Sequence, residues 1–339
     1  MKKVTFRYLM MIGLGAVIGL SSCSEDEEAI GPAPAGGNAG DELSTPASYE
    51  FFRNGSSSVS YTGQTDRLNQ LAEMKAVLLE GDQGMSVSAQ VLKEMYANAN
   101  ENGGGNFSFS SSKQIKNKTF ELDQAYFEDL FDATELASVS GVSGTVAANG
   151  QAGLVTRGSG KTILVDENGR EFTQLIEKGI MGATFYHQIA NVYLTDSKIG
   201  AGVNNTIVEE GQNYTEMEHH MDEAFGYLGA PTDFSSNYGG SGNVRYWAKY
   251  SNTADALIGM NDRLMTPFKR ARAAIAENEL SIKDAEVDQI YEELEVLIAA
   301  TAIHYANQSK AATVDGDRLH VISECYAFTR ALRYSRTDK

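Results

Sequence analysis

The stretch that decides the fold runs from Ile282 to Ser309 and reads IKDAEVDQIYEELEVLIAATAIHYANQS. Its apolar residues recur every three or four positions, which is the spacing of one face of an α-helix. That face consists of Ile290, Leu294, Leu297, Ile298, Thr301 and Tyr305. The pattern predicts one long amphipathic helix that packs against partners on its apolar side.

The same spacing recurs along most of the chain. The other expected helices span residues 65–81, 86–98, 120–139, 172–194, 213–228, 253–278 and 317–334. Thr65 and Asp66 are expected to cap the first of these, and Pro267 is expected to kink or divide the helix 253–278. Roughly eight helices, mostly antiparallel neighbours, predict an all-α fold made of one bundle or two packed bundles.

Two glycine-rich segments interrupt the helical pattern. Residues 102–112 are expected to form a loop, and six glycines break any helix between Gly141 and Gly160. Residues 153–155 and 162–165 suit short strands, so we expect a hairpin excursion within residues 140–170. The run from Gly158 to Thr162 is not a phosphate-binding loop, because Val155 stands where that motif needs glycine.

The first 22 residues have the layout of a secretory signal. A basic start precedes an apolar stretch from Leu9 to Leu20, and Leu20-Ser21-Ser22-Cys23 looks like a bacterial lipobox. We therefore expect a signal peptide over residues 1–22 and a lipid on Cys23, the alternative being an ordinary cleaved signal. Cys325 would then be the only free thiol, so no intramolecular disulfide is expected.

Residues 23–48 are expected to be an acidic flexible linker, because they contain prolines and glycines, several acids and no base. The globular domain is expected to span residues 49–339. The acidic run from Ser24 to Glu28 resembles a signal that moves lipoproteins to the outer face of the outer membrane; a solvated tether is the alternative. The expected location is the outer membrane, lipid-anchored and exposed at the cell surface.

The composition and the missing motifs exclude several functions. With 45 acidic and 28 basic residues the formal charge is −17, which argues against nucleic-acid binding. The sequence holds neither a Gly-x-Ser-x-Gly elbow nor a His-Glu-x-x-His motif. We therefore expect a binding protein rather than an enzyme.

Two groups of histidine and glutamate are candidate metal ligands. Glu216, His219, His220 and Glu223 share one face of a predicted helix, and His320 and Glu324 stand one turn apart on the last helix. Imidazole and carboxylate bind iron, zinc or manganese, and two facing helices would supply four ligands and open positions. The alternative is that each glutamate only orients a partly buried imidazole. His187 and His304 are expected to be core histidines.

The chain also resembles a known family, and these segments carry the resemblance: Tyr49–Phe52, Gly63–Leu68, Lys178–Ala183, His219–Tyr227, Phe268–Ile275 and Ser323-Glu324. The family consists of uncharacterised bacterial lipoproteins with a domain of unknown function and is similar to the imelysin-like proteins. The resemblance covers roughly residues 49–335, and the run His-His-Met-Asp-Glu-Ala-Phe-Gly-Tyr is its most specific part.

The resemblance implies an imelysin-like fold of two packed helical bundles and a role in iron uptake. The imelysin-like pattern is Gly-x-His-x-x-Glu; His220 and Glu223 match it, but Glu218 replaces the glycine. The expected function is to bind iron, another divalent metal or a metal-bearing ligand for an uptake system of the TonB type. The alternatives are a metallopeptidase-like hydrolase that uses His220 and Glu223, and a partner-binding helical module without a small-molecule site.

Overall fold

The computed structural model describes residues 43–234 and 244–336. The predicted signal peptide, Cys23 and residues 23–42 of the predicted linker lie outside the described residues. Helices dominate the described part of the chain, which confirms the all-α prediction. No helix in that part is long and apolar enough to span a membrane.

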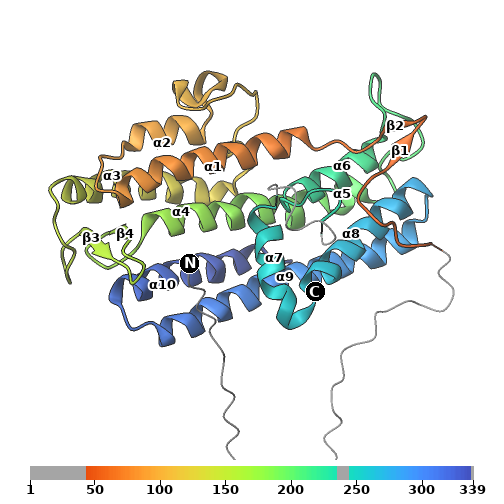
Figure 1. Ribbon diagram of the computed structural model, residues 1–339. Helices are drawn as coiled ribbons and strands as arrows, with labels where there is room; N and C mark the ends of the chain where they lie inside the picture. Colours follow the sequence, from red (N-terminus) through yellow and green to blue (C-terminus); the bar gives the residue numbers. More distant parts are fainter. Residues whose placement is uncertain (1–42, 235–243, 337–339) are drawn as a thin grey trace, which may run out of the picture. The chain divides into compact units, whose positions relative to one another are not determined.

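The order of elements follows the sequence pattern closely (Figure 1). The α-helices are α1 (Thr62–Asp82), α2 (Ala89–Tyr96), α3 (Gln124–Val142), α4 (Phe172–Ile180), α5 (Asp196–Ile199), α6 (Glu216–Gly226), α7 (Tyr246–Ile258), α8 (Met260–Ala276), α9 (Leu280–Ala311) and α10 (Asp315–Ala331). The strands are β1 (Phe52–Arg53), β2 (Ser56–Ser57), β3 (Gly153–Thr156) and β4 (Thr162–Val165). Single 3-10 turns lie at Ala99–Glu101, Gly103–Gly105, Lys116–Lys118, Glu121–Asp123 and Leu332–Tyr334.

Helix α4 is the centre of the core, and all of its residues are buried. It runs between α1 and α3 on one side and α10 on the other (Figure 1). Two glycines allow this close approach: a Cβ at Gly179 would lie 2.9 Å from the Phe127 ring, and one at Gly182 would lie 2.7 Å from the Ala331 Cβ. Larger residues at these two positions would push α3 and α10 away from the central helix.

The helix that begins with α4 continues through two π-helical segments, Met181–Tyr186 (η5) and Ile189–Tyr193 (η6). A π-helix closes i→i+5 hydrogen bonds, so each turn holds an extra residue compared with an α-helix. The expected single helix over residues 172–194 is therefore continuous, but its register changes twice. The second segment ends at Tyr193, beside α6.

Helix α9 packs against α8 and α10, as its apolar face predicts. From Ile290 to Thr301 the predicted face is buried, and Tyr305 is half-buried. The prediction that Pro267 divides the preceding helix is wrong, because α8 runs through Pro267 without interruption. The break lies instead at Gly259, whose φ of 63° ends α7 in the left-handed conformation that glycine adopts easily.

Helix α1 begins earlier than expected. Its first residue is Thr62, so Thr65 and Asp66 lie within the helix and do not cap it. The Asp66 carboxylate instead accepts a hydrogen bond of 2.6 Å from the Ser111 hydroxyl. The predicted cap is therefore wrong, and Asp66 holds part of the glycine-rich loop.

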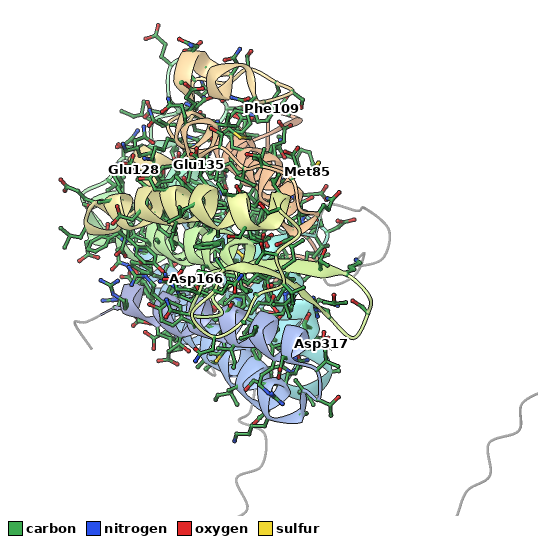
Figure 2. All side chains as sticks on the ribbon, turned by 90° about the vertical axis from the view of Figure 1, so that its left-hand side faces the viewer. Met85, Phe109, Glu128, Glu135, Asp166 and Asp317 are labelled. Carbon is green, nitrogen blue, oxygen red and sulfur yellow. The ribbon has the colours of Figure 1, made fainter. Side chains whose placement is uncertain are left out.

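The predicted hairpin within residues 140–170 is confirmed. Strands β3 and β4 pair antiparallel, with Leu154 opposite Leu164. The connecting turn binds the Asp317 carboxylate at the start of α10, through Arg157 Nε at 2.9 Å and the Gly158 amide at 3.0 Å. Figure 2 views this end of the molecule, with Asp317 labelled. The Gly158 amide therefore already donates to a carboxylate and is not available to bind a phosphate.

Candidate functional site

The N-terminus of α6 is fixed by a reciprocal pair of hydrogen bonds. Thr215 Oγ1 accepts from the Glu218 amide at 3.3 Å, and Glu218 Oε2 accepts from the Thr215 amide at 2.8 Å. This capping box begins the helix at Glu216 rather than at the predicted residue 213. Glu218 also forms ion pairs with Arg53 at 2.8 Å and Arg272 at 2.9 Å, so this residue anchors α6 from within.

The inner face of α6 is held by Asp222, which is fully buried. Its carboxylate accepts hydrogen bonds from Arg272 Nε at 2.9 Å, the Tyr49 hydroxyl at 2.9 Å and the Ser60 amide at 3.0 Å. Burial raises the pKa of Asp222 to about 6, although the Arg272 charge and these hydrogen bonds pull it down. The segment before α1 is thereby fastened to α6 and α8.

The two histidines of α6 are oriented by backbone carbonyls. His219 Nδ1 lies 3.0 Å from the Ser60 oxygen, and His220 Nδ1 lies 2.7 Å from the Lys198 oxygen. A carbonyl only accepts hydrogen bonds, so Nδ1 donates in both rings, and each Nε2 keeps its lone pair when the ring is neutral. The pKa of His220 is lowered, mainly by burial and also by the Lys198 charge, which favours the neutral ring.

Glu223 lies one turn beyond these rings. Its Oε1 accepts hydrogen bonds from Gln64 Nε2 at 3.0 Å and from the Tyr193 hydroxyl at 3.1 Å, and lies 3.9 Å from His219 Nε2. Glu216 is exposed at the start of the helix. We call His219, His220, Glu223, Gln64 and Tyr193 the α6 cluster.

The second predicted pair has different surroundings. His320 Nδ1 lies 2.8 Å from Glu171 Oε2, and its Nε2 lies 3.4 Å from Glu324 Oε2. Both ring nitrogens therefore face carboxylates that are themselves buried. Lys178 lies 3.9 Å from Glu324 and also pairs with Glu177, which Lys75 contacts at 2.8 Å.

These charges belong to a buried network between α1, α4 and α10. Its members are Lys75, Asp82, Glu171, Glu177, Lys178, His320 and Glu324. Burial raises the pKa of Asp82 to about 7, and the nearby Glu171 charge adds to this effect. Burial also raises the pKa of Glu324, against the charges of Lys178 and His320. For Glu177, the charges of Lys178 and Lys75 outweigh burial and lower the pKa.

The two predicted pairs do not face one another. Helix α6 lies beside α8, η6, α1 and α5, whereas α10 lies beside α9 and α4 (Figure 1). The structure thus brings His219 and Glu223 together, and separately His320 and Glu324, but forms no joint site. Within residues 43–234 and 244–336, no group of three or more histidine, cysteine, aspartate or glutamate side chains has a metal-binding arrangement.

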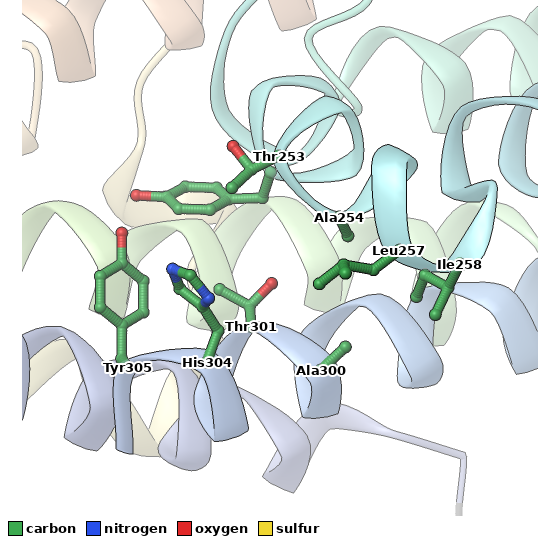
Figure 3. A pocket seen from close by; sticks show the side chains of 9 residues that line it. Thr253, Ala254, Leu257, Ile258, Ala300, Thr301, His304 and Tyr305 are labelled. Carbon is green, nitrogen blue, oxygen red and sulfur yellow. The ribbon is translucent and has the colours of Figure 1, made fainter. Parts of the chain in front are cut away.

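The remaining histidines occupy hollows in the surface. His304 is exposed, so its predicted place in the core is wrong; it lies at the edge of the α9 stripe and contacts Gln308 at 2.7 Å. Figure 3 shows it lining a mostly apolar pocket between α7 and α9, together with Leu257 and Tyr305. His187 is half-buried against the Phe120 ring, 5.1 Å away, and lines a more polar hollow.

Several members of the α6 region are absent from the sequence-based prediction. Gln64 and Tyr193 bind Glu223, while the ammonium groups of Lys118 and Lys198 lie 3.3 Å from Tyr193 and His220, respectively. These residues come from α1, η6, the segment before α3, and α5. Only the segment Gly63–Leu68, which the family resemblance includes, pointed to one of them.

Comparison with known proteins adds one match. The family model described as Domain of unknown function (DUF4856) matches residues 46–339. No curated protein and no solved structure matches the chain.

Proposed function

The chain belongs to the Domain of unknown function (DUF4856) family, and we propose that it is a surface lipoprotein that binds iron, another divalent metal or a metal-bearing ligand. The proposed cellular location rests on the sequence, which has a lipobox ending in Cys23 and an acidic run after it. In this proposal the protein is anchored in the outer membrane through the lipid on Cys23, is exposed at the cell surface, and serves an uptake system of the TonB type.

The observation that carries the proposal is the orientation of the two α6 imidazoles. Histidines that bind metals usually donate their other ring N–H to a carbonyl or carboxylate, which fixes the tautomer. His219 and His220 both do this, towards Ser60 and Lys198. The Nε2 lone pair of His219 then lies next to Glu223. Two or three protein ligands would leave coordination positions for water or for a chelating molecule.

The resemblance to the imelysin-like proteins supports iron as the metal. His220 and Glu223 match the histidine and glutamate of that pattern. The departure at Glu218 has a structural reason, because this buried carboxylate binds Arg53 and Arg272 instead of solvent or ligand. The proposed site therefore pairs His219 with Glu223, has His220 and Glu216 beside them, and leaves out His320 and Glu324.

Partner binding is a second candidate, favoured by the pocket between α7 and α9. Leu257 lines this pocket and its side chain is 83% exposed. Ala254 and Ile258 line the pocket with it, and a contiguous group of apolar side chains at the surface is typical of a region that contacts another protein.

The test is calorimetric titration of Fe²⁺, Mn²⁺ and Zn²⁺ into the wild type and into His219→Ala, His220→Ala and Glu223→Ala. We expect the wild type to bind at least one ion and each variant to bind it about 10-fold or more weakly. Because a ligating imidazole must be neutral, affinity should fall at acid pH, and the lowered pKa of His220 places its share of this fall below the ordinary histidine value of ~6.5.

His320→Gln is the matched control, because His320 has the same spacing to its glutamate but lies in the buried network. Its metal affinity should equal that of the wild type. Failure of the wild type to bind any ion, or equal affinity in all variants, would contradict the metal function.

A further inference from the structure

Four basic side chains gather around the α6 cluster. They are Arg67 from α1, Lys113 and Lys118 from the segment before α3, and Lys198 from α5. None of the four forms a salt bridge within the described part of the chain, although the sequence carries 45 acidic residues. Such a concentration of unpaired positive charge in an acidic protein needs an explanation.

Two of these ammonium groups flank the rings of the cluster. Lys118 Nζ lies 3.3 Å from the Tyr193 hydroxyl, which donates to Glu223. Lys198 Nζ lies 3.3 Å from His220 Nε2. The rings of Tyr193 and His220 are 6.3 Å apart, so the two lysines contact neighbouring rings of the cluster.

The other two cations meet over Gly63, next to the Gln64 that binds Glu223. A Cβ at Gly63 would lie 3.1 Å from Lys113 Cε and 3.5 Å from Arg67 Nη1. Arg67 is held rigidly, because its Nε donates to the Gln114 carbonyl at 2.9 Å and its Nη1 to the Gly63 carbonyl at 3.0 Å. The close contact at Gly63 leaves little room for any larger residue.

A buried hydroxyl completes this region. Tyr227 is fully buried, and its hydroxyl makes no hydrogen bond of good geometry in the described residues, although the Arg67 guanidinium lies beside it. Its ring lies 6.1 Å from that of Tyr193, and the nearby Arg67 charge opposes the effect of burial on its pKa. A buried polar group without a partner costs free energy unless a ligand or water satisfies it.

The charges repel one another in this arrangement. Burial lowers the pKa of Lys118, and the charges of Arg67, Lys198 and Lys113 lower it further, while Glu223 alone opposes them. A metal ion without a chelating anion would not relieve this repulsion. Arginine and lysine around fixed hydroxyl and amide groups are instead typical of sites that bind carboxylate or phosphate.

We infer that the α6 cluster binds a ligand with two or more oxyanion groups, carboxylate or phosphate, which contact Lys118, Lys198 and Arg67. The inference rests on the proposed function, because it names the ligand class of the same site. A metal would then be bound as part of an anionic chelate, and His219 and Glu223 are the residues that would hold it. An anionic chelate would also explain why the cluster offers few protein ligands to a metal.

The experiment is calorimetric titration of citrate, inorganic phosphate and ferric citrate into the full-length protein at pH 7 and constant ionic strength. The variants are Lys118→Gln and Lys198→Gln. Lys249→Gln is the matched control, because Lys249 is an exposed lysine of α7 away from the cluster. Circular dichroism checks that each variant is folded. The citrate and phosphate arms distinguish the two kinds of oxyanion.

We expect at least one of the three probes to bind the wild type, each cluster variant to bind it at least 10-fold more weakly, and Lys249→Gln to match the wild type. No binding of any anionic probe, or equal affinity in the cluster variants, would overturn the inference. If Mn²⁺ or Zn²⁺ binds while these anions do not, the ligand class fails and the metal function stands. If citrate binds with this lysine dependence and no metal or ferric citrate does, the metal function fails and the ligand class stands.

Discussion

The pairs His219–Glu223 on α6 and His320–Glu324 on α10 have the same spacing and lie in opposite environments. The side chains of the first pair are 31% and 19% exposed, and those of the second are 16% and 7% exposed. His219 turns Nδ1 to a backbone carbonyl and Nε2 towards Glu223 at 3.9 Å, whereas both nitrogens of His320 face carboxylates at 2.8 and 3.4 Å. An identical pattern on a helix thus leads to a candidate binding site in one place and to a structural contact in the other.

The two pairs differ in the charged side chains that neighbouring elements place around them. Around α10, Lys178 pairs with Glu177 and Glu324, and Asp82 lies near Glu171 and His320, so these buried charges find their partners within the protein. Around α6, cations predominate and Glu223 is the acid that opposes them. A network that satisfies itself stabilises the fold, whereas one with uncompensated charge is suited to a ligand.

The largest expected effect is a difference in unfolding free energy between variants of Lys178 and Lys118. Lys178→Met should destabilise the protein by about 3–5 kcal/mol, because it leaves buried Glu324 and Glu177 without their shared cation. Lys118→Met should stay within about 1 kcal/mol of the wild type, because this lysine has no ion pair to lose. Urea unfolding measures both free energies. Similar values for the two variants would remove the distinction between the regions.

The next effect concerns Asp82 and pH. Its pKa of about 7 in the folded protein lies above the value of an unfolded aspartate, near 3.9, so the folded state binds the extra proton. This contribution to stability is present at low pH and is lost as the pH rises towards 7. Relative to Asp82→Asn, the wild type should lose on the order of 2 kcal/mol between pH 5 and pH 8. Parallel pH profiles from thermal unfolding would contradict the raised pKa.

The smallest effect compares two tyrosine hydroxyls. Tyr246→Phe should cost about 1 kcal/mol, because its buried hydroxyl donates a hydrogen bond of 2.8 Å to the Leu68 carbonyl. Tyr227→Phe should be neutral or slightly stabilising, because its hydroxyl makes no hydrogen bond of good geometry in the described residues. Differential scanning calorimetry resolves both changes, and a loss of stability in Tyr227→Phe would show that this hydroxyl is satisfied in solution.

Much of the fold followed from local pattern. The α9 stripe and the β3–β4 hairpin were predictable because periodicity and turn residues act over a few positions. The predicted break at Pro267 failed for a tertiary reason, since the proline is buried within a packed helix and the turn instead uses Gly259. The predicted cap at Thr65 failed because the chain enters α1 from Tyr61.

The site was predictable only within one helix. The shared face of His219 and Glu223 follows from helical spacing. Gln64, Lys118 and Lys198 reach the cluster from segments that are distant in the sequence, and no local pattern encodes their approach. The other partner of His320 could not be predicted for the same reason, because Glu171 lies at the end of the hairpin, 149 positions away.

Because of the two π-helical segments, the direction of the Tyr193 side chain depends on the exact number of residues between α4 and Tyr193. One residue rotates the direction of an α-helix by roughly 100°, and each π turn holds one residue more than an α turn. Deleting a single residue between Met181 and Tyr186 would leave α4 in place but turn Tyr193 away from Glu223 and Lys118. An in-frame deletion or insertion there is therefore more damaging to the cluster than most substitutions. The number of residues between α4 and Tyr193 therefore determines the geometry of the site as much as the identity of those residues does.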